Sequence, residues 1–169
     1  MIHINIGSNL SSYYGSKFEN ISIATNLLIE SKLKIKRISS FYETPSYPNN
    51  NLPRFINVGL IATYNYGFEK LIDAISLIEK KIGRIKSGKN SPRVCDIDII
   101  DFKGLIKKNK RIIIPHPRAH LRNFVLYPIK QIDRNWCHPI YKKNVVDLIK
   151  ELSSKSRIEI TRLRKSVIM

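Results

Sequence analysis

The hydrophobic periodicity of the first hundred residues changes in a fixed order, and this order limits the folds open to the chain. Residues 2–6 alternate apolar and polar side chains, as a half-buried strand does, whereas residues 18–31 repeat apolar side chains at helical spacing. The same patterns predict strands at 33–42 and 55–64, a helix at 68–82 and a strand at 94–102. The order strand, helix, strand, strand, helix, strand predicts an α+β fold, namely a ferredoxin-like antiparallel sheet of the split βαβ type with packed helices.

The remainder of the chain gives weaker signals, which predict C-terminal edge elements added to this sheet. These elements are a strand at 111–114, a helical turn at 118–123, a helix at 145–152 and a peripheral strand at 158–164. Residues 43–53 contain three prolines and three consecutive asparagines, which predict a loop. Because the chain has 169 residues and no internal repeat, we expect one domain that spans residues 1–169.

The charge balance indicates an anionic partner. The chain has 30 Lys and Arg residues against 13 Asp and Glu residues, a formal net charge of +17. Nucleic acid and a nucleoside triphosphate would both satisfy this charge. The two cysteines, Cys95 and Cys137, form no disulfide framework, and no apolar run approaches the roughly 18 residues of a membrane span. We therefore expect a cytoplasmic protein with no membrane partner.

The strand expected at 94–102 is unusual because carboxylates interrupt its β-branched residues. Successive strand side chains alternate faces at about 3.3 Å per residue, so Asp96 and Asp98 should share a face with Cα atoms roughly 6.6 Å apart. Two such carboxylates raise each other's pKa unless a cation is present, and Mg²⁺ prefers oxygen ligands of this kind. The stretch predicts a magnesium site, with Arg93 beside it for an anionic ligand; the alternative is an exposed edge strand with ordinary surface acids.

Several other residues allow more than one interpretation. The basic segment 83–92 leads into the aspartate strand and predicts a lid, although its G-x-x-x-x-G-K pattern stands in the wrong context for a P-loop. His116 fits a hydrogen bond to a phosphate or sugar better than a zinc site, because the two cysteines lack paired spacing. Asn57, in the middle of a strand, is either an edge position open to water or a ligand-binding amide.

Several motifs occur in the order found in the 6-hydroxymethyl-7,8-dihydropterin pyrophosphokinases of the folate pathway, and about residues 2–130 resemble that family. The motifs are GSNL at 7–10, SFYETP at 40–45, FIN at 55–57, GR at 83–84, PRVCDID at 92–98, IPHPR at 114–118 and RNF at 122–124. The chain departs from the pattern at Asn90 and Ser91, near which the family often has Trp, and at Pro117, where an aromatic residue is frequent. The resemblance implies transfer of the diphosphoryl group of ATP to the hydroxymethyl oxygen of the pterin, with AMP released.

The resemblance also implies a role for individual residues. Asp96 and Asp98 would bind two Mg²⁺ ions, and Arg84 and Arg93 would neutralise the transferring group. The ATP site would contain Glu79, Lys86, Arg111, His116 and Arg122. The pterin pocket would contain Thr44, Pro45, Tyr47, Phe55, Asn57 and Phe124. The protein would act as a monomer on these two small molecules, and a ferredoxin-like nucleic-acid-binding domain is the alternative that the charge leaves open.

Overall fold

The computed structural model describes residues 1–169 except 48, 50, 85–91, 110–111 and 168–169. Its centre is a six-stranded sheet with the order β5-β1-β4-β3-β8, in which β2 also pairs with β4. The strands are β1 (Ile2–Ser8), β2 (Lys34–Ile38), β3 (Tyr42–Thr44), β4 (Phe55–Thr63), β5 (Asp96–Phe102) and β8 (Thr161–Arg162). A second sheet consists of β6 (Lys107–Lys108) and β7 (Ile113–Ile114). All the pairings are antiparallel, which confirms the antiparallel sheet expected from the sequence.

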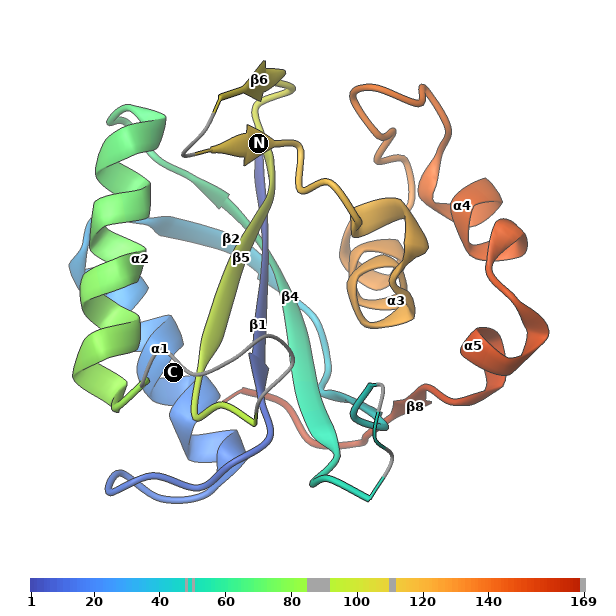
Figure 1. Cartoon of the computed structure of the whole chain (residues 1–169). Coiled ribbons are helices and arrows are strands. Elements are labelled where there is room, and N and C mark those ends of the chain that lie inside the picture. Colours follow the sequence, from blue (N-terminus) through green and yellow to red (C-terminus); the bar gives the residue numbers. More distant parts are fainter. Residues whose placement is uncertain (48, 50, 85–91, 110–111, 168–169) are drawn as a thin grey trace.

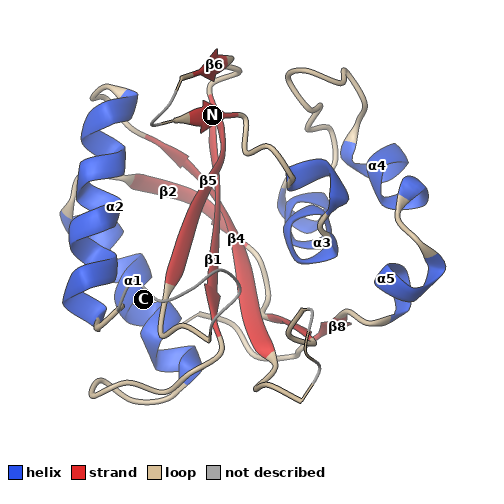
Figure 2. Cartoon of the chain, in the orientation of Figure 1, coloured by secondary structure: helices blue, strands red, loops and turns tan. Residues whose placement is uncertain are grey.

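Helices cover both faces of the large sheet. They are α1 (Lys17–Glu30), α2 (Phe68–Ile82), the 3₁₀ helix η1 (Ala119–Leu121), α3 (Asn123–Ile132), α4 (Val145–Glu151) and α5 (Ser154–Ile158). Figures 1 and 2 show α1 and α2 on one side of the sheet and α3, α4 and α5 on the other. Helix α2 ends at Gly83, whose φ of 100° lies in the left-handed region that glycine adopts without strain.

The alternation in β1 separates an apolar core from a polar layer. Ile2, Ile4 and Ile6 are fully buried in the core that α1 and α2 cover. The intervening His3 and Asn5 are also buried, but they lie on the opposite face, where His3 contacts Asp133 and Trp136. The side of the sheet that faces α3 therefore carries polar side chains in the central strand β1. Such buried polar groups can hydrogen-bond to a ligand.

A β-bulge keeps the acidic residues of β5 on that polar face. In the register of β1 with β5, Asn5 is opposite Asp98, Ile4 is opposite Ile99 and His3 is opposite Asp101, so one residue of β5 is extra. The bulge returns Asp101 to the side of Asp98, where Asp101 accepts a hydrogen bond from Trp136 Nε1 at 2.9 Å. Strict alternation along residues 94–102 did not predict this shift.

The structure corrects three of the expected elements. Residues 33–42 form two strands, β2 and β3, because Ser39 leaves the ladder: its hydroxyl accepts from the backbone N–H of Gly59 at 2.9 Å. Residues 154–158 form α5, so the peripheral strand expected at 158–164 shortens to β8. The helical turn expected at 118–123 forms η1, and the full helix α3 that follows it was not expected.

Candidate active site

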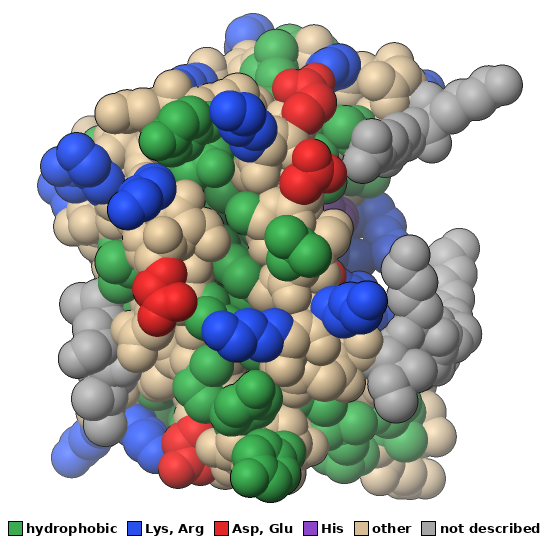
Figure 3. All heavy atoms as spheres, turned by 90° about the vertical axis from the view of Figure 1, so that its left-hand side faces the viewer, with side chains coloured by type: hydrophobic (Ala, Val, Ile, Leu, Met, Phe, Trp, Pro, Cys, Tyr) green, Lys and Arg blue, Asp and Glu red, His purple; other side chains and the backbone are tan. Residues whose placement is uncertain are grey.

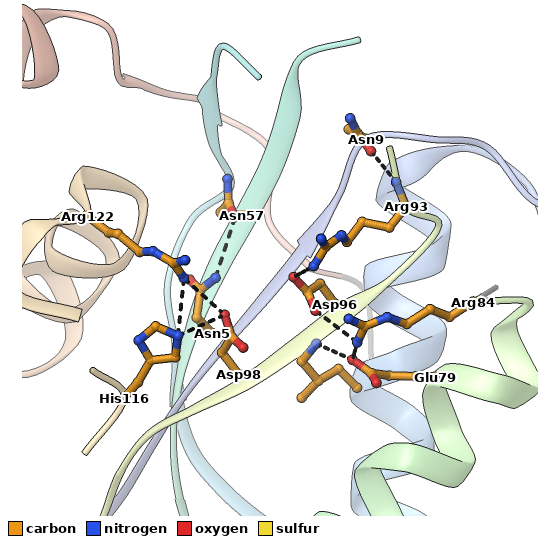
Figure 4. Close-up of polar contacts among 11 residues, drawn as sticks. Asn5, Asn9, Asn57, Glu79, Arg84, Arg93, Asp96, Asp98, His116 and Arg122 are labelled. Carbon is orange, nitrogen blue, oxygen red and sulfur yellow. Dashed lines mark hydrogen bonds and ion pairs between the residues drawn. The ribbon is translucent and has the colours of Figure 1, made fainter. Parts of the chain in front are cut away.

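The two aspartates of β5 lie where the polar face of the sheet meets the end of α2 and the start of α3 (Figure 4). Asp96 is opposite Gly7 and Asp98 is opposite Asn5 in the register with β1. Two residues apart on one strand, they share a face as expected. Strand β5 is an edge strand of the described sheet, but its carboxylates are ion-paired and only about a quarter exposed, so the interpretation as ordinary surface acids is wrong.

Two arginines hold the Asp96 carboxylate, one on each oxygen. Arg84 Nη1 lies 2.9 Å from Oδ1, and Arg93 Nη1 lies 2.7 Å from Oδ2. Arg84 follows the last turn of α2, whereas Arg93 belongs to the segment that leads into β5. Asp96 therefore brings together two guanidinium groups whose positive charge would also suit a polyphosphate.

Glu79 fixes Arg84 from the other side. Its carboxylate forms an ion pair with Arg84, and its Oε1 accepts a hydrogen bond from the backbone N–H of Ile97 at 2.8 Å. Burial raises the pKa of Glu79 above its ordinary value, which Arg84 and the Ile97 hydrogen bond partly offset. The contact joins the end of α2 to β5 and orients Arg84 toward Asp96.

Asp98 has weaker compensation for its charge. Its Oδ2 lies 3.5 Å from Arg122 Nη1 and 3.9 Å from His116 Nε2. Burial, together with the neighbouring Asp96, raises the pKa of Asp98 to about 7. A carboxyl group in this condition favours an additional positive charge beside it.

His116 is a neutral hydrogen-bonding group near pH 7. Burial and the adjacent Arg122 lower its pKa to about 4. Its Nδ1 accepts the backbone N–H of Arg118 at 3.1 Å, so Nε2 carries the proton of the neutral ring and points toward Asp98 and Arg122. A donating Nε2 is what a hydrogen bond to a phosphate or sugar would need, and that role for His116 stays a prediction.

A pocket of about 300 Å³ opens beside these groups. Its polar end consists of Glu79, Arg84, Asp96, Asp98 and His116. Its other end is apolar and is lined by side chains of α2, β5 and the segment 112–114. A pocket with one charged and one apolar end suits a molecule that joins a polyphosphate to a flat ring system.

Most residues expected around the pterin gather on the neighbouring strands, but Tyr47 does not. Asn57 lies on the central strand β4 and is 2% exposed, so the interpretation as an edge position open to water is wrong. Its amide nitrogen donates to Thr44 Oγ1 at 3.4 Å, and Phe55 pairs with Thr44 across the strands. Phe124 opens α3, with the Arg122 guanidinium 5.3 Å from its ring centre. Pro45 is half-buried next to Thr44, whereas the Tyr47 side chain is 83% exposed.

Two expected ATP-site residues, Lys86 and Arg111, lie outside the described residues, as does most of the expected lid. Asn9 is a residue whose contacts the sequence did not predict. Its Oδ1 accepts the backbone N–H of Arg93 at 2.7 Å, while its amide nitrogen reaches Ser46 Oγ at 3.3 Å. These partners are 84 and 37 residues away in the sequence, so no local pattern predicts the contacts.

The described residues offer no zinc site. Among them, no three His, Cys, Asp or Glu side chains gather as metal ligands. Cys95 is buried in the core and Cys137 is exposed, and both are free thiols. In the same described part of the chain, no helix has the length and apolar character needed to cross a membrane.

Comparison with known proteins identifies the family. The model of the 7,8-dihydro-6-hydroxymethylpterin-pyrophosphokinase (HPPK) family matches residues 3–134. The chain is 34% identical over 142 residues to the 2-amino-4-hydroxy-6-hydroxymethyldihydropteridine pyrophosphokinase of Aquifex aeolicus, covering 84% of this chain and 86% of that one. It is 35% identical over 131 residues to the mitochondrial folate synthesis bifunctional protein of Pisum sativum, covering 76% of this chain and 24% of the longer relative.

A solved structure shares the fold. The crystal structure of a triple mutant of Plasmodium falciparum HPPK-DHPS with STZ-DHP superposes with a TM-score of 0.65 at 13% identity, covering 95% of this chain and 46% of that one. Together with the sequence matches, this places the chain among the ATP-dependent diphosphotransferases. The chain belongs to the HPPK family, as the sequence motifs indicated. Membership confirms the expected transfer of a diphosphoryl group to hydroxymethyldihydropterin in folate biosynthesis, and nucleic-acid binding is not favoured.

The surface agrees with that outcome on the side that Figure 3 shows. Over α1 and α2, Lys and Arg side chains are scattered among acidic and apolar ones rather than gathered into one stripe. A nucleic-acid-binding face would need such a stripe to follow the phosphate backbone.

Proposed function

We propose that the chain carries out this transfer at the site formed by Asp96, Asp98, Arg84, Arg93, His116 and Arg122. The observation that supports it most strongly is the meeting of three arginines with two neighbouring carboxylates, one of which has a raised pKa, at the charged end of a half-apolar pocket. Diphosphoryl transfer needs positioning and charge neutralisation more than covalent help, and this is the chemistry of these side chains.

The donor set fits magnesium. Asp96 and Asp98 offer carboxylate oxygens, and the raised pKa of Asp98 reflects negative charge that its neighbours do not fully compensate. Mg²⁺ is commonly held by one or two carboxylates together with substrate phosphates. Asp96 and Asp98 would hold two Mg²⁺ ions, which would neutralise phosphate charge when bound.

The protein's own residues bind and orient the phosphates. Arg84 and Arg93 change partners from Asp96 to the triphosphate, since phosphate oxygens accept the same charge-assisted hydrogen bonds from a guanidinium group as carboxylate oxygens do. His116 Nε2–H donates to a phosphate oxygen, and Arg122 neutralises charge beside it. Glu79 keeps Arg84 at the mouth of the pocket. Lys86 and Arg111, expected in the ATP site from the family resemblance, complete this set of cations.

The pterin binds between the polar layer and the start of α3. Asn57 and Thr44 supply donor and acceptor groups, and Phe55 and Phe124 supply aromatic surface for the flat ring. Pro45 and Tyr47 come from the loop after β3, and Tyr47 reaches the ring only if this loop closes.

We also propose a fold class, a domain extent and an oligomeric state for the chain. The strand order β5-β1-β4, with β2 and β3 together on the far edge of β4, supports a ferredoxin-like split βαβ arrangement. We propose that residues 1–169 form one domain, which acts as a cytoplasmic monomer.

The test is the identity of the products. Incubation with ATP, Mg²⁺ and 6-hydroxymethyl-7,8-dihydropterin should give AMP and the pterin diphosphate, separated by ion-exchange chromatography. Asp96→Ala and Asp98→Ala should abolish turnover while each retains a cooperative unfolding transition. ADP as the nucleotide product would refute diphosphoryl transfer, and full activity in both variants would refute the metal assignment.

A further inference from the structure

Asn5 is a buried amide at the centre of the sheet that the proposed mechanism does not use. It lies in the middle of β1, is 4% exposed, and is opposite Gly59 on one side and Asp98 on the other. Figure 4 shows it between Asn57 and the His116–Arg122 pair. A polar side chain buried in a central strand costs free energy unless its donors and acceptor are used, so its neighbours define its role.

Those neighbours decide which end of the Asn5 amide is the nitrogen. Two backbone carbonyl oxygens face one end of the amide, and carbonyls only accept hydrogen bonds. With the amide nitrogen at this end, Asn5 donates to Phe124 O at 3.0 Å and to Val58 O at 3.2 Å. The hydrogen bond to Phe124 O attaches the start of α3 to β1, and the hydrogen bond to Val58 O links the Asn5 side chain to β4.

The other end of Asn5 faces Asn57. The two side-chain amides approach to 3.5 Å, and Asn57 continues to Thr44 at 3.4 Å. With its nitrogen held by the two carbonyls, Asn5 presents its oxygen to Asn57. To hydrogen-bond with this oxygen, the Asn57 amide has to turn from the orientation described above, in which its nitrogen donates to Thr44. Its nitrogen then faces Asn5 and its oxygen accepts from the Thr44 hydroxyl, which can donate as well as accept.

We propose that Asn5 is a positioning residue for pterin recognition: through its hydrogen bonds to Phe124 and Val58 it fixes the orientation in which Asn57 offers donor and acceptor to the substrate. This inference rests on the proposed role of Asn57 in the pterin pocket. A fixed amide distinguishes the adjacent ring N–H and C=O groups of a pterin from the reversed pattern of its 4-amino analogue. A freely turning amide accepts both patterns.

The experiment measures steady-state kinetics for Asn5→Ala and Asn5→Asp with both substrates, and competitive inhibition by the 4-amino analogue of the pterin. The substitution to Asp keeps the shape of the side chain but removes the donor. Each variant should raise KM for the pterin about tenfold, corresponding to one or two lost hydrogen bonds, and change KM for ATP less than about threefold. Asn5→Ala should also lower the preference for the pterin over its analogue about tenfold.

Matched variants separate this role from a loss of stability. Ile4→Val, at the neighbouring position of β1 on the opposite face, shortens a fully buried side chain without touching the pocket and should leave both KM values unchanged. The inference would be overturned if Asn5→Ala left the pterin KM and the discrimination against the 4-amino analogue unchanged while Asn57→Ala greatly weakened pterin binding. The proposed pocket would still stand in that case. No effect in either variant would overturn both, and absence of AMP formation by the unmodified protein would overturn the proposed function itself.

Discussion

A close approach of α3 to the sheet depends on a glycine, and adding one methyl group there should affect both stability and activity. Gly59 lies on β4, and a Cβ at this position would stand 2.9 Å from Pro128 Cβ and 3.4 Å from Ile132 Cδ1. Carbon atoms prefer about 3.5–4.0 Å, so in Gly59→Ala the helix has to move away by roughly 0.6–1 Å. Helix α3 carries Phe124 in its first turn and follows directly on Arg122, so the movement displaces both.

Overpacking of this kind costs about 1–3 kcal/mol, and the better strand propensity of Ala returns about 0.5–1 kcal/mol. The net loss of about 1–2 kcal/mol should lower Tm by about 2–8 °C for a chain of this length. Because displacement of binding groups by such distances is costly, kcat/KM should fall about tenfold or more.

Calorimetry and the product assay, run on the same preparations, measure the two effects. Gly67→Ala is the matched control, because its new Cβ would meet only Glu69 Oε2 at 3.8 Å. Because Gly67 is the N-cap of α2, where Ala is less favourable than Gly, the control should lose no more than about 1 kcal/mol and should keep its kcat/KM. A Gly59→Ala variant as stable and as active as this control would refute the close packing of α3 on β4.

Three further predictions concern buried polar groups. The pKa of Asp98 is raised from 3.8 to about 7, so the ionised carboxylate destabilises the fold: the cost is absent below pH 3.8, grows with pH and is complete above pH 7. In urea titrations without metal, Asp98→Asn should therefore be more stable than the unmodified protein by about 1–3 kcal/mol at pH 8. At pH 4 the two proteins should be nearly equal in stability. Burial and His120 lower the pKa of His138 from 6.5 to about 4, so this histidine should remove about 1–3 kcal/mol of stability as pH drops from 6.5 to 4. His138→Asn, whose oxygen can still accept the local backbone N–H groups, should lose that much less than the unmodified protein over the same range, and an equal loss in the two would contradict the assignment. Trp136→Phe removes the hydrogen bond to Asp101 and should lower the free energy of unfolding by about 1–3 kcal/mol. The Kd for an ATP analogue should not change. A changed Kd with an unchanged free energy of unfolding would contradict a purely structural role for Trp136.

The sequence was a good guide to the elements because their periodicity records burial directly. Ile2, Ile4 and Ile6 alternate with polar residues, and all three isoleucines are in the core. The sequence could not predict the bulge in β5, because an inserted residue depends on the partner strand rather than on the residues of β5. It also could not predict that Ser39 would interrupt the strand at 33–42, because that depends on a hydrogen bond to Gly59.

The candidate site, too, could be predicted from the sequence only in part. The spacing of Asp96 and Asp98 places them on one face of a strand without any knowledge of the fold. The contacts of Asp98 with Arg122 and His116 join different elements, so no local pattern predicted them. The residues themselves favoured a phosphate- or sugar-binding role for His116, and the family resemblance added Arg122 to the predicted site. Asn5 was missed because a polar residue in an alternating strand is normally solvent-facing, and its burial depends on α3 covering that face of the sheet.

Titration calorimetry with a non-hydrolysable ATP analogue, with and without Mg²⁺, tests most directly whether the β5 carboxylates and their arginines form the nucleotide site. The unmodified protein should bind the analogue at least about a hundredfold more tightly with Mg²⁺ than without it, and Asp98→Asn should lose most of this difference. Equal affinity in the presence and absence of Mg²⁺, or an undiminished metal effect in Asp98→Asn, would contradict the account.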